Sequence, residues 1–349
     1  MKKRDFKNIL GVSLLELLIG VLVTSLMMGA LYTSYDVVNK TYNQVSSKAK
    51  ISRSSRDLVS MLMRDIRMAG YRYYVGQQTI QKFKEKTEDG CGGTGMTLPN
   101  TSYLAFDDGY DDQELSHNPI VIRKNTLGYA PSDPEDNTEA VTDTIDDPNV
   151  NDQCCDQIQI VYEDFSMSSA GDLLQPFKKY RITYFAERNT SGGETRYSVY
   201  KTVEAWAQQR VNAGACLAWP VSGSWKSNCP ECVSKELIRD HIEDMEFVPF
   251  DVNGLVIQNT AGDFPTPEGD NDIRSRLFDI TGVDVRLTFR SKDTFFKKNR
   301  DRPIKSLLGG RSKDYSDKYL RDSVIVTVHS RNIGSNLFQW KTIIKKVLL

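Results

Sequence analysis

The stretch Gly11-Val12-Ser13-Leu14-Leu15-Glu16 opens an apolar run over residues 12–31, in which Glu16 is the only charged side chain. At about 1.5 Å per residue, a helix over this run is roughly 30 Å long, which matches the thickness of a bilayer core. Basic side chains precede the run, at Lys2, Lys3, Arg4 and Lys7. This positive charge predicts that the N-terminus stays in the cytoplasm and that the rest of the chain is exported.

The small residue Gly11 stands before the apolar run, whereas a secretory signal has its small residues after its apolar core. A cut after Gly11 therefore removes the basic leader and leaves the membrane helix on the mature chain. This arrangement resembles the class III signal of type IV prepilins and pseudopilins. In that signal a glycine precedes the cut, a hydrophobic residue begins the mature chain, and a glutamate is its fifth residue. The resemblance implies cleavage between Gly11 and Val12 by a prepilin peptidase and N-methylation of Val12, where the family usually has phenylalanine.

Glu16 is a carboxylate inside a membrane segment, which costs about 2.5–3.5 kcal/mol and usually marks a function. In pilins the glutamate at this position compensates the N-terminal amine of a neighbouring subunit. The resemblance implies the same assembly role for Glu16. The alternative is an interfacial glutamate that reaches the lipid headgroups from the helix end.

The charge balance and the motif content argue against several classes of protein. The chain has 45 basic and 46 acidic side chains, which is too balanced to indicate a nucleic-acid partner. It contains no nucleophile elbow, phosphate loop, dinucleotide fingerprint or paired zinc ligands. The sequence therefore predicts a protein that is not an enzyme and needs no cofactor.

The helical pattern continues beyond the membrane run. Apolar side chains recur at spacings of three and four in two groups, Val38, Tyr42, Val45 and Ala49, then Leu58, Leu62, Ile66 and Ala69. This spacing predicts one helix from about Val12 to Ala69, ended by Gly70 in the left-handed conformation. The alternative is two helices with a kink near Gly29 or at residues 52–55.

The run 61–71 includes Arg64-Asp65-Ile66-Arg67 and ends in Ala69-Gly70-Tyr71. It resembles the end of the N-terminal helix in the PilW subfamily of minor type IV pilins, and its charges are interpreted as a solvated helix face. The resemblance implies a structural subunit that acts with other minor pilins, the major pilin, an assembly platform protein and a tip adhesin in a priming or tip complex. It also implies an inner-membrane subunit with a periplasmic head, and then a place at the pilus tip.

After Tyr71 the pattern changes to the period of two that is typical of strands. It predicts a hairpin that joins strands at 179–186 and 196–201, and two further strands at 283–290 and 319–330. Weaker strand patterns lie at 120–123 and 157–162. Residues 236–247 fit either a helix or a strand. The sequence therefore predicts an α+β fold in three parts. These are a leader (1–11), a transmembrane and then amphipathic helix (12–70), and an antiparallel β-sheet head with long disulfide-stapled loops (71–349).

The cysteines suit disulfides in an oxidising compartment, with the connectivity open. They are Cys91, Cys154, Cys155, Cys216, Cys229 and Cys232. The Cys229–Cys232 pair forms a CxxC motif, whose alternatives are a redox dithiol and half of a zinc site. No second CxxC or paired histidine accompanies it, so structural disulfides are favoured.

Two further groups of side chains are candidate binding sites. Asp107, Asp108, Asp111 and Asp112 are dense enough to suggest calcium, but they lack EF-hand spacing, and a solvated acidic loop is the favoured alternative. Trp219 and Trp225 lie in a loop that is predicted either to contact a partner or to join the core.

Two other functions fit the same N-terminal signal. One is a J-type pseudopilin of a type II secretion system. The other is a tip adhesin or DNA-uptake receptor, with the tryptophan- and cysteine-rich loops as the ligand surface.

Overall fold

The structure is a computed structural model of the chain. It describes residues 13–71, 117–129, 154–165, 177–191, 194–208, 223–260, 262–267, 276–308 and 312–333. The chain falls into two compact units, residues 1–50 and 51–349.

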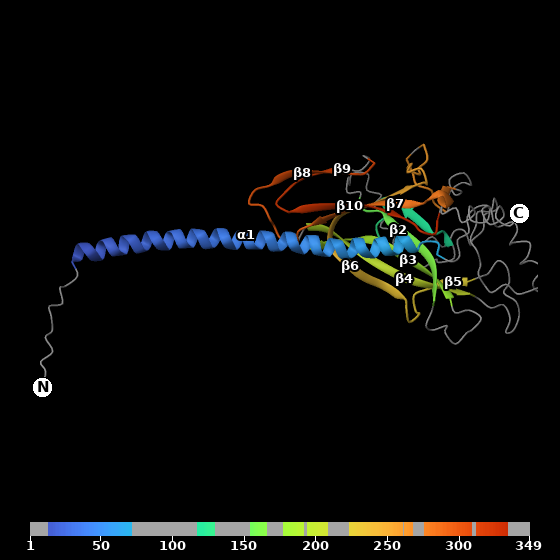
Figure 1. The fold of residues 1–349 in the computed structure, drawn as a ribbon, viewed down its shortest axis with the longest axis horizontal. Helices are drawn as coiled ribbons and strands as arrows, with labels where there is room; N and C mark the ends of the chain where they lie inside the picture. The colour runs from blue at the N-terminus through green and yellow to red at the C-terminus, as the bar shows by residue number, and fades with distance from the viewer. Residues whose placement is uncertain are drawn as a thin grey trace, which may run out of the picture. The chain divides into compact units, whose positions relative to one another are not determined.

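Helix α1 runs from Leu14 to Met68, as the spacing of apolar side chains predicts (Figure 1). Ser13 caps its N-terminus, because the Ser13 hydroxyl accepts the N–H of Leu15 at 3.3 Å. Gly70 ends it with a φ of 71°, the left-handed conformation expected of a glycine there. Helical structure is unbroken at Gly29 and over residues 52–55, so the alternative of two separate helices is not observed.

The second unit contains an antiparallel sheet of eight strands in the order β1-β2-β3-β4-β6-β7-β10, with β5 paired to β4. Strands β8 and β9 form a separate two-stranded sheet. The bounds are β1 Ile120–Arg123, β2 Gln157–Phe165, β3 Phe177–Ser191, β4 Glu194–Gln208, β5 Gly223–Lys226, β6 Val233–Phe250, β7 Gly282–Arg290, β8 Arg300–Lys305, β9 Ser312–Asp317 and β10 Arg321–His329.

Each strand that the sequence predicts is present, and the ambiguous segment 236–247 is part of strand β6. Strand β6 pairs with β4 on one side and β7 on the other. Its register shifts at several points along β4 and once along β7, between Ile242 and Asp244. Each shift interrupts the alternation of side chains, which explains why the period in the sequence is mixed.

The C-terminal part of α1, from Ile51 onward, packs on one face of the large sheet (Figure 1). Its buried side chains recur at helical spacing and each exposes 4% or less of its surface: Ile51, Leu58, Leu62, Ile66 and Ala69. They join one core with apolar side chains of the sheet that include Ile160, Ile182, Met245, Phe247 and Leu287. The predicted α+β fold, a helix on an antiparallel sheet, is confirmed.

Part of the opposite face of the sheet is also buried, although strand β10 and the start of β6 stay largely exposed. Arg181 and Thr183, two polar side chains in the middle of β3, are fully buried. The Arg181 Nε donates to Glu204 Oε2 at 2.7 Å, so the ion pair satisfies part of the buried guanidinium. In the same way Arg286 of β7 donates to Glu246 of β6 at 3.3 Å. Cross-strand ion pairs thus allow polar alternation on a buried face.

Candidate functional site

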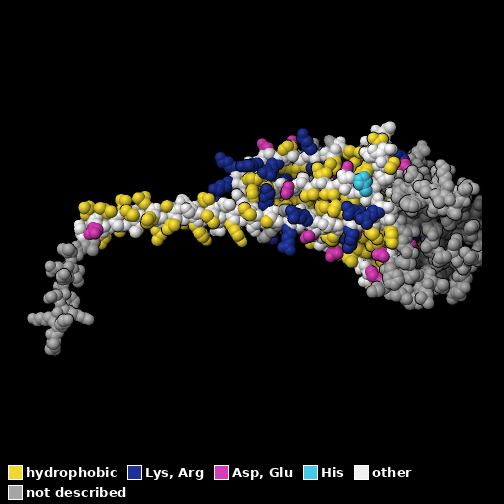
Figure 2. Space-filling view, in the orientation of Figure 1, with side chains coloured by type: hydrophobic (Ala, Val, Ile, Leu, Met, Phe, Trp, Pro, Cys, Tyr) yellow, Lys and Arg dark blue, Asp and Glu magenta, His cyan; other side chains and the backbone are white. Residues whose placement is uncertain are grey.

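The first part of α1 has a surface that nothing in its own unit covers. One described helix is long and apolar enough to cross a membrane by length and composition, over Leu14–Ala49, and none of its most apolar window is buried. Figure 2 shows hydrophobic side chains along this segment. Since apolar surface in water is unfavourable, this segment needs lipid or other helices around it.

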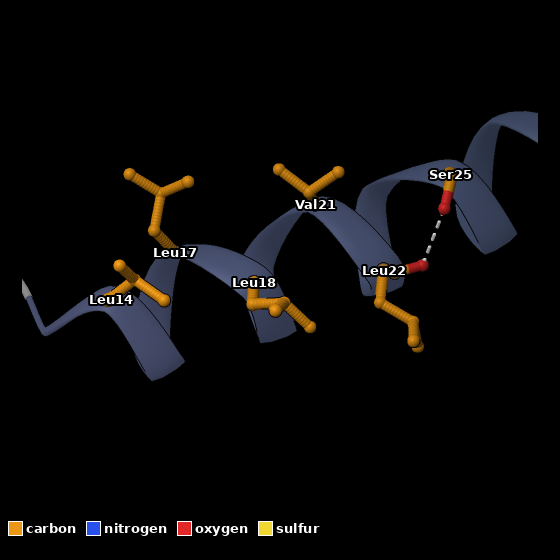
Figure 3. Close-up of a pocket in the computed structure, with 6 residues that line it drawn as sticks. All are labelled: Leu14, Leu17, Leu18, Val21, Leu22 and Ser25. Atoms are coloured by element: carbon orange, nitrogen blue, oxygen red, sulfur yellow. Dashed lines mark hydrogen bonds between the residues drawn. The ribbon is translucent and has the colours of Figure 1, made fainter.

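A shallow apolar groove lies along the start of the helix (Figure 3). Its lining residues recur at spacings of three and four along one side: Leu14, Leu17, Leu18, Val21, Leu22 and Ser25. The Ser25 hydroxyl donates to the carbonyl of Leu22 at 2.9 Å, and the Thr24 hydroxyl donates to that of Gly20 at 2.9 Å. Because these hydroxyls bond to their own helix, they leave no unsatisfied donor in lipid.

Glu16 lies in the first turn of α1, three residues after the cap Ser13, and its side chain is exposed. A negative charge there is favourable, because the N-terminal end of a helix has a partial positive charge. Glu16 forms no ion pair with any residue in the described part of the chain. Its carboxylate is therefore accessible to a cation from outside. Gly11 and Val12 lie outside the described residues.

Asp65 connects the helix to the sheet, and sequence reasoning missed this role. Its side chain is 2% exposed, which corrects the interpretation of the charges near residue 65 as a solvated helix face. Asp65 Oδ2 accepts hydrogen bonds from Lys201 Nζ at 2.8 Å and from the Tyr184 hydroxyl at 2.7 Å. Burial, and then the Asp65 charge, raise the pKa of Tyr184, so its hydroxyl stays a donor.

The sequence did contain a signal for this burial. Asp65 follows Leu58 by seven residues and Leu62 by three, so it lies on the same side of the helix as those core side chains. A charge on an apolar stripe indicates a buried partner, because an unpaired buried charge is strongly unfavourable. Arg64, its neighbour, stays largely exposed and donates to Asp65 Oδ1 at 3.1 Å.

Residues after strand β10 hold the C-terminal end of α1. The Asn332 side-chain amide donates to the carbonyls of Arg67 and Ala69, each at 3.2 Å. The backbone N–H of Gly70 donates to the carbonyl of Val161 at 2.9 Å. The loop after β10 thus satisfies carbonyls that the helix leaves without partners, and strand β2 accepts the N–H of the terminating Gly70.

The structure pairs the described cysteines as two local disulfides, Cys154–Cys155 and Cys229–Cys232. The CxxC motif is therefore closed on itself, one of the pairings that the sequence left open, and no described cysteine is free. Both cysteines of the first pair lie with Asp244 in a group of potential metal-ligand atoms, but the two sulfurs are bonded to each other. Cys91 and Cys216 lie outside the described residues.

Trp225 is a core residue, and its burial at 4% exposure does not agree with a partner-contacting surface. Its ring lies 5.3 Å from that of Trp206 and 5.4 Å from that of His117. The guanidinium of Arg181 lies over it at 4.8 Å. Pairing of β5 with β4 places Trp225 opposite Trp206, which is itself partly buried against the core. The other candidate, Trp219, and the calcium candidates Asp107, Asp108, Asp111 and Asp112 lie outside the described residues.

Comparison with known proteins gives only distant similarity, and it comes from solved structures. No family model matches the chain, and no curated protein matches it. Among solved structures, it is similar to a type IV-like pilin from Thermus thermophilus, with 11% identity and a TM-score of 0.24. The match covers 51% of this chain and 80% of that one.

Proposed function

We propose that this chain is a membrane-anchored structural subunit of the type IV pilin class, which enters a filament through helix α1. One observation carries the proposal: α1 exposes its apolar side chains over Leu14–Ala49, and from Ile51 the same helix is part of the core of a β head. A helix of this kind is suited to an exchange of lipid for the helices of other subunits, while the head keeps its own core.

The N-terminal residues support processing of the pilin type. Cleavage between Gly11 and Val12 would remove the basic leader and place a new amine two residues from the start of α1 at Leu14. In this proposal Val12 is the N-methylated residue. The accessible carboxylate of Glu16 compensates the amine of a neighbouring subunit, which fixes the axial register of the helices more than it adds stability.

The finer assignment is a minor pilin of the PilW type. Its support is the run from Arg64 to Tyr71 together with the size of the head, residues 51–349. A bulky head meets fewer neighbours at the tip of a filament than in its shaft. We therefore propose a non-catalytic priming or tip complex with other minor pilins, a tip adhesin and the major pilin. The prepilin peptidase and the assembly platform protein would act on the chain in the inner membrane.

Two measurements in cells test the proposal: where the mature chain begins, and whether a Glu16 variant enters the filament. N-terminal sequencing of the protein from sheared filaments is expected to begin at methylated Val12. The Glu16→Ala variant is expected to be processed normally and to fall at least several-fold in the filament fraction, since the amine loses its counter-charge. Asp36→Ala is the matched control, because Asp36 is a carboxylate of the same helix beyond the apolar run. Normal incorporation of Glu16→Ala, or a chain that keeps Met1, would refute the proposal.

A further inference from the structure

The part of α1 beyond the apolar run has an exposed apolar surface that lipid does not cover. A bilayer core is about 30 Å thick, and a helix over residues 12–31 already spans it. Tyr35, Val38, Tyr42 and Val45 come later in the helix, and each exposes between 63% and 69% of its surface. Large apolar side chains kept in water indicate an interaction surface. This stretch therefore needs a protein partner.

The spacing of these side chains indicates what the partner is. Steps of four and three residues alternate along one series, which we name the stalk seam: Leu31, Tyr35, Val38, Tyr42, Val45 and Ala49. This is a heptad pattern, with Tyr35 and Tyr42 at a positions and Val38 and Val45 at d positions. A strict repeat of seven has a period of 3.5 rather than 3.6, and it indicates a left-handed coiled coil with another helix.

The seam has a defined end. Continued past Ala49, the same steps fall on Ser52 and then on Arg56, whose side chain is exposed. The repeat therefore stops where the head begins, since the second unit starts at Ile51. Its length of nearly three heptads lies wholly within the first unit.

The residues beside the seam are compatible with an identical partner. The e and g positions of a coiled coil face across the interface, where like charges would repel. Here they are occupied by Tyr32, Ser34, Asn39, Thr41, Ser46 and Lys48, of which only the last is charged. The charged side chains Asp36 and Lys40 take the outer b and f positions and pair with each other. Two copies of the helix would therefore meet without repulsion along most of the seam.

We propose that the stalk seam joins two copies of this chain as a parallel, in-register, left-handed coiled coil next to the membrane. Copies anchored in one membrane with the same orientation are parallel and begin at the same height. Confinement to the membrane also raises their effective concentration. This dimer goes beyond the proposed function. Successive subunits of a filament are displaced along its axis, whereas in this dimer each seam residue faces the same residue of the other copy.

Cysteine cross-linking of the full chain in membranes tests the pair, with no other assembly protein expressed. Val38→Cys and Val45→Cys each place a thiol at a d position, and Ser47→Cys places one at the outer f position as the matched control. The unsubstituted chain reports any background from its own cysteines. With a mild oxidant, dimers of the two seam variants are expected to form at least tenfold faster than dimers of Ser47→Cys.

A second set of variants separates the pair from other arrangements. Val38→Asp in the Val45→Cys chain is expected to lower the cross-linking rate to that of the control, because it puts a charge into the seam. Equal rates at seam and outer positions would overturn the proposal. A mixture of the Val38→Cys and Val45→Cys chains gives a further check. Faster cross-linking between the two variants than within each variant would indicate a staggered contact and would also overturn the proposal. Cross-linking that requires other assembly proteins would refute the pair while leaving the proposed function intact.

Discussion

At the residue scale, Asp65 fixes the position of the helix on the sheet. Its partners Lys201 and Tyr184 come from adjacent strands, β4 and β3, and all three side chains are buried. A buried ion pair adds little net stability compared with an apolar contact, but it penalises every other register of the helix. A helix shifted along the sheet would separate Asp65 from Lys201, and a buried charge without its partner is strongly unfavourable.

The variant Asp65→Asn is therefore expected to destabilise the head by about 3–5 kcal/mol, because Lys201 keeps a buried charge that nothing compensates. Urea unfolding of the full chain in detergent measures this loss. Asp57→Asn is the control, since Asp57 is exposed on the same helix. The double variant Asp65→Asn/Lys201→Met is expected to recover most of the stability. A loss no larger than that of Asp57→Asn would contradict the role of Asp65.

A second buried cation gives a dependence of stability on pH. Burial lowers the pKa of Lys179 to about 8, an effect that Glu163 on the paired strand partly opposes. In the unfolded chain a lysine keeps its proton up to about pH 10.4. Between these values the unfolded chain binds more protons, so the free energy of unfolding rises with pH.

Stability is thus expected to increase between pH 8 and 10 by up to about 3 kcal/mol, and the Lys179→Met variant is expected to lose this increase. Urea unfolding at pH 7, 8, 9 and 10 gives the slope of the free energy of unfolding against pH for the unsubstituted chain and for Lys179→Met. The slopes are compared rather than the absolute stabilities, because the substitution itself alters packing. Parallel curves for the two proteins would show that Lys179 is charged in the folded state throughout this range.

At the scale of elements, the close approach of β6, β7 and β10 depends on Gly282. This residue opens β7 and pairs with Phe250 on one side and His329 on the other. A Cβ added at Gly282 would meet the Phe250 ring and would lie 2.8 Å from the carbonyl oxygen of Val328. The backbone at Val328 cannot move away from such a Cβ unless the spacing between β7 and β10 changes.

Gly282→Ala is therefore expected to cost about 1–3 kcal/mol, the usual penalty for extra volume in a packed core. Thermal unfolding of the full chain provides the measurement. Gly20→Ala is the matched control, since a Cβ at Gly20 meets no atom within 4 Å. Phe250→Leu added to Gly282→Ala is expected to restore part of the loss. An unchanged midpoint for Gly282→Ala would mean that the strands adjust more freely than their packing suggests.

At the scale of the whole molecule, the two units have different requirements. Residues 51–349 contain the sheet and the buried end of α1, whereas the segment up to residue 50 exposes its apolar side chains. Burial of a large aliphatic side chain contributes about 1.5–3 kcal/mol. Ile51, Leu58, Leu62 and Ile66 together therefore contribute an amount comparable with the 5–15 kcal/mol stability of a typical domain.

Two truncations test this division. A chain of residues 51–349 is expected to be soluble without detergent and to unfold cooperatively, because it keeps the core side chains of the helix. A chain of residues 72–349 is expected to aggregate, because the sheet face that the helix covers is then exposed to water. Light scattering and thermal unfolding distinguish the two. A stable, soluble 72–349 chain would show that the helix is not part of the core.

The sequence by itself determined the helix, its apolar run, its end at Gly70 and most of the strands, because periodicity and turn residues act locally. Tertiary structure alone decided which distant side chain pairs with Asp65, namely Lys201, which lies 136 residues away. It also decided that Arg181 is buried on the second face of the sheet and that Trp225 belongs to the core. Pairing across the sheet sets such contacts, and the local sequence contains no record of which distant side chain will lie opposite.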